Sequence, residues 1–201
     1  LSALAQKANI QLRHETVEKV KHGYARVVKW GDIKNNIPPN LKILPVAMIP
    51  HKSKPYRCIL DLSFGIDHNS IQYPSVNERT TKLENQRSMG QLGFVVWRLV
   101  HVMEANRQQG LPFWFAKLDV KDGLWQMAVR NEDAWNFAYV LPLLNTEVDV
   151  NEINLVIPNS LQMSWCESPP LFCTGSETAR DIMVELSTKD LPAHKYETDM
   201  L

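Results

Sequence analysis

The sequence predicts an α+β fold, and three observations carry this prediction. Short apolar segments typical of strands do not alternate with helical segments, so a doubly wound α/β sheet is disfavoured. Two of these segments, 43–49 and 56–62, flank a short basic turn, which is typical of a β-hairpin. Apolar residues recur with helical spacing over 2–22, 88–109 and 168–187.

Each expected helix has a defined feature. The first should end at Gly23, and its predicted buried stripe consists of Leu4, Ile10, Val17 and Val20. The second carries one apolar face, formed by Met89, Leu92, Val96, Leu99 and Met103. The third should begin at Ser168, because serine caps helices and Pro169 and Pro170 suit a first turn.

Further strands are expected at 24–30, 113–118, 125–129 and 136–141. Residues 63–79 are polar and turn-rich, and residues 143–154 are acidic and loop-like. The strand at 113–118 ends on Asp119. A carboxylate at the end of a buried strand is costly unless it is paired or binds a metal. Asp119 can hold Mg²⁺ together with neighbouring backbone carbonyls, and a helix cap or turn aspartate is the alternative. Asp122 and Gly123 indicate a tight turn around this place.

Charge is distributed unevenly along the chain. Residues 1–57 contain eleven Lys and Arg against three Asp and Glu, whereas residues 58–201 contain eleven against nineteen. Basic surface attracts phosphates, and acidic residues gather cations such as Mg²⁺.

Cysteine usage and hydropathy limit the setting of the protein. Cys58, Cys166 and Cys173 are odd in number without C-x-x-C spacing, which argues against a disulfide framework and a zinc site. No stretch reaches the ~20 apolar residues of a membrane helix, and the first residues do not resemble a signal peptide. We therefore expect an intracellular protein, in cytoplasm or nucleus, that is not secreted and has no membrane partner. The chain does not begin with Met, so we expect it to be a piece of a longer one.

Four segments, in order, resemble motifs of reverse transcriptases from eukaryotic retrotransposons, similar to those of diatoms and related protists. Residues 51–62, HKSKPYRCILDL, resemble the fingers hairpin, and 75–77, SVN, the Asn-containing segment after it. Residues 115–125, FAKLDVKDGLW, resemble the first catalytic motif. Residues 161–172, LQMSWCESPPLF, resemble the motif that lines the nucleotide pocket and opens the palm helix. The resemblance covers roughly residues 24–187.

The resemblance implies a right-hand polymerase architecture with fingers and a partial palm, built from a mixed or antiparallel sheet with helices. The implied division is an N-terminal helix at 1–22, fingers at 23–105 with 128–163, and partial palm at 106–127 and 164–201.

The implied activity is template-directed DNA synthesis by two-metal nucleotidyl transfer. Its partners would be an RNA or DNA template with its primer, and a dNTP. Asp119 would be the catalytic carboxylate that bridges two Mg²⁺ ions, and the Val120 carbonyl would add a metal ligand.

The resemblance also implies nucleotide-binding residues. Lys52 and Arg57 would bind the β- and γ-phosphates. Leu124 stands where the family carries the aromatic ring that excludes a ribose 2′-hydroxyl. Met163 and Ser164 would form the pocket floor.

Structural alternatives remain open for these side chains. Arg57 could pair with Asp61 across a turn, and Lys52 and Lys54 could be solvated residues of a hairpin tip. Core packing is the alternative for the apolar residues, Leu124, Trp125 and Met163.

The sequence departs from the family pattern at three places. Ser164 replaces the usual Gly, and its Cβ can force a different backbone angle. Leu124 gates the sugar less well than an aromatic ring. The third catalytic motif, Tyr-x-Asp-Asp, is missing, because at Tyr196–Asp199 a Thr replaces the first Asp. We therefore expect the metal site to be incomplete and this piece to be inactive alone. The true hairpin would then lie beyond Leu201 in the same polyprotein, and whether RNase H or integrase regions follow is left open by the sequence.

Three functions compete at this stage. The first is the N-terminal part of an RNA-directed DNA polymerase. The second is a degenerate retroelement remnant that binds nucleic acid without catalysis, which fits the three departures. The third, a metal-dependent nuclease using Asp119 and Asp122, explains neither the fingers hairpin nor the later motif.

Overall fold

The computed structural model describes residues 3–52, 55–82, 93–112, 120–143 and 149–187. The expectations at Lys54, Met89, Leu92, 113–118, Asp119 and Tyr196–Asp199 lie outside these ranges. The chain forms two compact units, Leu1–Leu83 with Leu118–Ser168, and Glu84–Lys117 with Pro169–Leu201. Within the described ranges, none of the helices combines the length and apolar character needed to cross a membrane.

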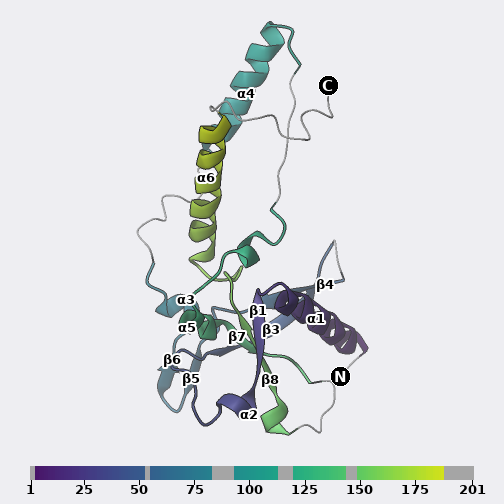
Figure 1. The fold of residues 1–201 in the computed structure, drawn as a ribbon, viewed down its shortest axis with the longest axis vertical. Helices are drawn as coiled ribbons and strands as arrows, with labels where there is room; N and C mark the ends of the chain where they lie inside the picture. The colour runs from purple at the N-terminus through teal and green to yellow at the C-terminus, as the bar shows by residue number, and fades with distance from the viewer. Residues whose placement is uncertain (1–2, 53–54, 83–92, 113–119, 144–148, 188–201) are drawn as a thin grey trace. The chain divides into compact units, whose positions relative to one another are not determined.

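The first unit is organised around a four-stranded mixed sheet with strand order β1-β8-β7-β2 (Figure 1). β1 (Ala25–Lys29) pairs antiparallel with β8 (Asn154–Pro158), which pairs antiparallel with β7 (Ala138–Val140). β7 pairs parallel with β2 (Ile43–Leu44). A mixed sheet accompanied by helices confirms the predicted α+β class.

Strand β8 is buried on both faces. Val156 belongs to a core cluster with Leu12 and Tyr139, whereas Leu155 and Ile157 belong to a second cluster with Ala138. All three β8 side chains are at most 1% exposed. A strand covered on both faces has a continuous apolar run in its sequence rather than an alternating one. Strand β8 was not among the strands expected from the sequence.

The expected hairpin is confirmed. β3 (Val46–Pro50) and β4 (Tyr56–Leu60) pair antiparallel from Val46 opposite Leu60 to Pro50 opposite Tyr56. Pro45 divides the first predicted strand into β2 and β3, because proline lacks the N–H that a continuous ladder needs.

The turn-rich segment 63–79 contains regular structure that was not expected. The segment contains a second hairpin, β5 (Ile66–His68) with β6 (Ile71–Tyr73), followed by α3 (Val76–Arg79). Asn69 and Ser70 form the two-residue turn, with φ of 50° and 62°. Positive φ at both central positions is what a type I′ hairpin turn requires, and Asn is favoured there.

The strand expected at 125–129 is wrong. Residues Gly123–Gln126 form a 3₁₀ turn, η2, and only an isolated bridge joins Ala128 to Ser160. The strand expected at 136–141 is confirmed in its centre as β7. The other short elements of this unit are α2 (Trp30–Ile33), α5 (Asn131–Ala134), η3 (Trp135–Phe137) and η4 (Val150–Glu152).

Helix α1 (Ala3–Lys21) ends as predicted, since Gly23 adopts φ of 76°, but its predicted buried face is wrong. Ile10 and Val17 are more than 60% exposed, and the buried positions are Asn9, Leu12 and Thr16. Burial of these polar groups is offset in part by hydrogen bonds, although the Asn9 Oδ1 has no partner among the described residues. Asn9 donates to the Leu143 carbonyl at 3.3 Å, and the Thr16 hydroxyl lies 3.4 Å from that of Tyr139.

The second unit contains α4 (Gly93–Gln108) and most of α6 (Ser168–Ser187). Both helices were predicted, and α6 begins at the expected Ser168. On α4, three residues of the predicted apolar face are exposed, namely Val96, Leu99 and Met103.

The orientation of α1 can be tested with two truncations. We expect Leu12→Ala to lower the free energy of unfolding by about 2–5 kcal/mol, because it opens a cavity in the core. The matched Ile10→Ala should change it by less than about 0.5 kcal/mol, since Ile10 is exposed. Urea denaturation followed by circular dichroism measures both, and a larger loss for Ile10→Ala would contradict the observed face.

Candidate functional site

The β3–β4 hairpin and the loop that follows β8 meet at Arg57. The Arg57 guanidinium Nη2 contacts the Met163 thioether, although the two residues are 106 positions apart in sequence. Met163 is 63% exposed, so it is not the core residue of the alternative interpretation. Lys52 is exposed near the hairpin tip.

The alternative pairing of Arg57 with Asp61 is not seen in the described part of the chain. The Asp61 carboxylate instead accepts the N–H of Ser63 at 3.0 Å. Arg57 therefore contacts a thioether, which is a weak acceptor, and retains guanidinium N–H groups for a stronger one.

Ser164 fits the loop without backbone strain. It is not among the non-glycine residues with positive φ, which are Asn69, Ser70 and Asp122. Its hydroxyl donates to the carbonyl of Leu60, the last residue of β4. The serine at this position therefore ties the loop to the hairpin strand that carries Arg57.

The side-chain amide of Asn77 also holds this loop, through hydrogen bonds on both its nitrogen and its oxygen. Its Nδ2 donates to the Ser164 carbonyl and to the Ser63 hydroxyl, both at 3.0 Å. Its Oδ1 accepts the N–H of Cys166, also at 3.0 Å. One half-buried amide therefore joins α3, the end of the β4 segment and the loop.

Helix α3 is itself fixed by a capping box, in which Ser75 and Glu78 satisfy each other's backbone N–H groups. The bond from the Ser75 N–H to the Glu78 carboxylate is 2.6 Å long and is the main cause of the lowered pKa of Glu78. The Ser-x-x-Glu spacing was visible in the sequence, but the positioning role of Asn77 was not recognised from it.

Trp165 anchors the next turn of the loop. Its indole N–H donates to the Thr80 hydroxyl at 2.9 Å, and its ring meets Phe137 edge-on at 5.5 Å. Edge-to-face contact is a favourable aromatic geometry. Trp165 therefore connects the loop to the core cluster around Phe137.

The segment after Asp119 forms the expected tight turn. The Gly123 N–H donates to the Val120 carbonyl at 3.2 Å, and Asp122 adopts left-handed φ and ψ of 53° and 33°. Leu124 is half-buried, and the neighbouring Trp125 ring lies 3.8 Å below the Lys19 ammonium of α1. This cation–π contact secures the turn on α1.

The turn and the loop are joined just beyond these residues. The Leu161 N–H donates to the Met127 carbonyl at 2.9 Å, and the Val129 N–H to the Asn159 carbonyl at 2.9 Å. The structure thus brings Arg57, Met163 and Ser164 together directly. Val120 and Leu124 lie on the adjoining segment, without a hydrogen bond to those three within the described ranges.

The residues present fit a cation only in part. Among the described residues, no three His, Cys, Asp or Glu side chains gather as a metal site, and Asp119 is outside that set. The Val120 carbonyl accepts one hydrogen bond and has a second lone pair for a ligand. Val120 as a whole residue is 55% exposed.

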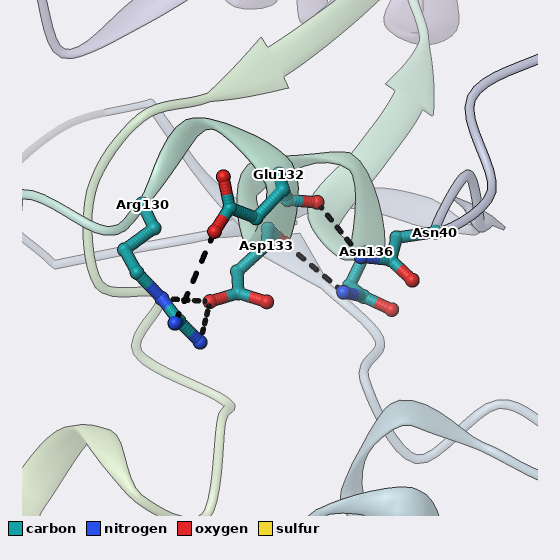
Figure 2. Close-up of polar contacts among 5 residues, drawn as sticks. All are labelled: Asn40, Arg130, Glu132, Asp133 and Asn136. Carbon is teal, nitrogen blue, oxygen red and sulfur yellow. Dashed lines mark hydrogen bonds and ion pairs between the residues drawn. The ribbon is translucent and has the colours of Figure 1, made fainter.

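A separate charged cluster around α5 is a solvated ion-pair group. Figure 2 shows Arg130 between Glu132 and Asp133, with the Arg130 Nη2 2.7 Å from the Asp133 carboxylate. The Asn40 amide donates to the Glu132 carbonyl at 3.1 Å. Exposed pairs of this kind contribute at most about 1 kcal/mol, and their opposite charges leave no net cationic site.

Comparison of the chain with protein-family models finds no match, and comparison with curated proteins finds no significant similarity.

The role of Asn77 gives a measurable prediction. We expect Asn77→Ala to lower the free energy of unfolding by about 2–4 kcal/mol, because it leaves polar groups of Ser164 and Cys166 without their partner. Asn77→Asp should also destabilise, since a carboxylate cannot donate to the Ser164 carbonyl. Chemical denaturation measures these changes. The control is Asn40→Ala, which removes one exposed bond and should cost less than about 1 kcal/mol. Equal losses for Asn77→Ala and Asn40→Ala would contradict the role of Asn77.

Proposed function

We propose that this chain is the N-terminal part of a reverse transcriptase, an RNA-directed DNA polymerase that acts on a primed RNA or DNA template inside the cell. The observation that supports it most is the contact between Arg57 and Met163. The hairpin and the loop were each assigned to the nucleotide site from a separate motif. A false resemblance gives no reason for these two distant segments to meet.

In this proposal Arg57 binds the triphosphate of the incoming dNTP, with Lys52 at the hairpin tip. A guanidinium offers a planar fork that matches phosphate oxygens, and an ammonium supplies a compact charge. A phosphate is a far better acceptor than the Met163 sulfur, so a bound nucleotide displaces the thioether from Arg57. Met163 then contributes polarizable apolar surface to the pocket floor.

Ser164 retains its proposed role in the pocket floor. Its backbone does not need the left-handed conformation that would favour glycine, and its hydroxyl is satisfied by Leu60. The departure from the family's glycine is therefore compatible with an ordered loop.

Asp119 and the Val120 carbonyl would hold Mg²⁺, whose chemistry is to neutralise developing negative charge during nucleotidyl transfer. The tight turn at Asp122 and the contact of Trp125 with Lys19 keep Val120 and Leu124 in position. We propose that a further carboxylate pair, supplied elsewhere in the polyprotein, is needed for activity.

A degenerate remnant that binds nucleic acid without catalysis is the second candidate. The observation that favours it is Leu124, which lacks the aromatic ring that the family uses against the ribose 2′-hydroxyl. Such a remnant would retain Arg57 and the basic N-terminal region but would not extend a primer.

The triphosphate role of Arg57 can be tested on this chain. Titration with fluorescent dNTP and dNMP should show tighter binding of the triphosphate, and Arg57→Gln should reduce that preference about tenfold, as expected for loss of a charge-assisted bond. Arg130→Gln is the matched control, because Arg130 is already paired with Asp133, and should leave the preference unchanged. An unaltered preference in Arg57→Gln would contradict the assignment.

Catalysis can be tested on a longer chain that includes a downstream Asp-Asp hairpin. Primer extension with Mg²⁺ should be abolished by Asp119→Ala and retained in Asp122→Asn, because asparagine also tolerates the left-handed backbone. Normal extension by Asp119→Ala would show that the catalytic site is wrongly assigned. Binding of primed template without any extension by the unmutated chain would favour the remnant.

A further inference from the structure

A concave site lies on the first unit and shares none of its residues with the Arg57–Met163 contact. It is a pocket of about 280 Å³ lined by residues of the β5–β6 hairpin, the end of α3 and the segment around β2. Its principal lining residues are Lys42, Ile43, Phe64, Ile66, Tyr73 and Arg79. Two cations and two aromatic rings therefore border one small cavity.

Glu78 partly offsets the charge of the two cations, which together with its carboxylate leave a net positive charge. Partial burial, and next the positive charge of Arg79, lower the pKa of Lys42, while Glu78 acts in the opposite direction. Glu78 is engaged by the Ser75 N–H. Among the residues that the structure describes, the Arg79 guanidinium forms no hydrogen bond or ion pair. An anion held between Lys42 and Arg79 would relieve their repulsion.

The rest of the lining is apolar and open to solvent. Tyr73 is 51% exposed, Ile66 49% and Ile43 44%. A planar ring placed against Tyr73 would cover this surface, and stacking of a base on an exposed aromatic side chain is a common mode of nucleotide recognition.

The elements that carry these side chains are locally fixed. The turn at Asn69 and Ser70 closes the β5–β6 hairpin, in which Tyr73 pairs with Ile66. The capping box at Ser75 sets the start of α3, and Arg79 is the last residue of that helix. The Lys42 ammonium donates to the Pro74 carbonyl, which holds it at the pocket rim.

We propose that this pocket binds one nucleotide, with its phosphate between Lys42 and Arg79 and its base against Tyr73. The volume is close to the lower end of small-ligand pockets, about 300–1,000 Å³, and suits a single nucleotide. The site is additional to the proposed dNTP site. The nucleotide is either free or part of a single strand, because both present the same phosphate and base.

The test uses the Arg57→Gln chain, so that the triphosphate site contributes little and the outcome does not depend on the proposed polymerase function. A fluorescent nucleoside monophosphate is titrated, with inorganic phosphate as a competitor, and a short single-stranded oligonucleotide is titrated separately. We expect Arg79→Gln and Lys42→Gln each to weaken binding of both nucleic-acid ligands about tenfold. Tyr73→Leu should weaken the same binding about fivefold or more but leave phosphate competition unchanged.

Two further variants make the result decisive. Tyr73→Phe retains the ring and should bind normally, whereas Arg130→Gln removes a cation outside the pocket and should have no effect. Tighter binding of the oligonucleotide, with the same variant pattern, identifies a single strand as the source, and equal binding identifies a free nucleotide. Absence of binding, or binding that is insensitive to Arg79→Gln and Tyr73→Leu in folded protein, overturns the proposal.

Discussion

Burial of both faces of β8 is the constraint on which the first unit depends. Leu155 and Ile157 pack into one core cluster and Val156 into the other. β1 and β7 pair with the strand on its two sides, so β8 lies between the two clusters. β8 also determines where the site begins. After Pro158, the backbone of Asn159 bonds to Tyr24 and that of Leu161 to Met127. The loop with Met163 and Ser164 therefore starts from a fixed point at the C-terminal end of β8.

Polar bonds, rather than further apolar packing, complete the site. The amide of Asn77 reaches the loop on both sides of Trp165, and the Ser164 hydroxyl reaches β4. Hydrogen bonds are directional, so they define one loop conformation, whereas apolar contacts alone would allow several. The same hydrogen bonds fix the loop with Met163 exposed and in contact with Arg57.

The arginines of the first unit differ in what they contact. Arg130 is paired with Asp133, and Arg26 stacks over Trp135 at 5.0 Å. Arg57 meets only a thioether, and Arg79 has no side-chain partner among the described residues. Guanidinium groups without a carboxylate partner are suited to an external anion. This distinction is the common physical basis of the two proposed nucleotide sites, which the net charge of zero does not reveal.

Local signals in the sequence determined the helices α1 and α6, the end of α1 at Gly23 and the β3–β4 hairpin, because periodicity, caps and turns act over a few residues. They also selected Arg57, Met163 and Ser164, whose proximity the structure shows, whereas Asp119 lies outside the described residues. The buried face of α1, the strand β8, the bonds of Asn77 and the pocket of Lys42 and Arg79 were decided only by tertiary structure. Each depends on partners distant in sequence. The buried Thr16 hydroxyl lies beside the Tyr139 hydroxyl, and Asn77 positions the loop because Ser164 and Cys166 fold back onto α3.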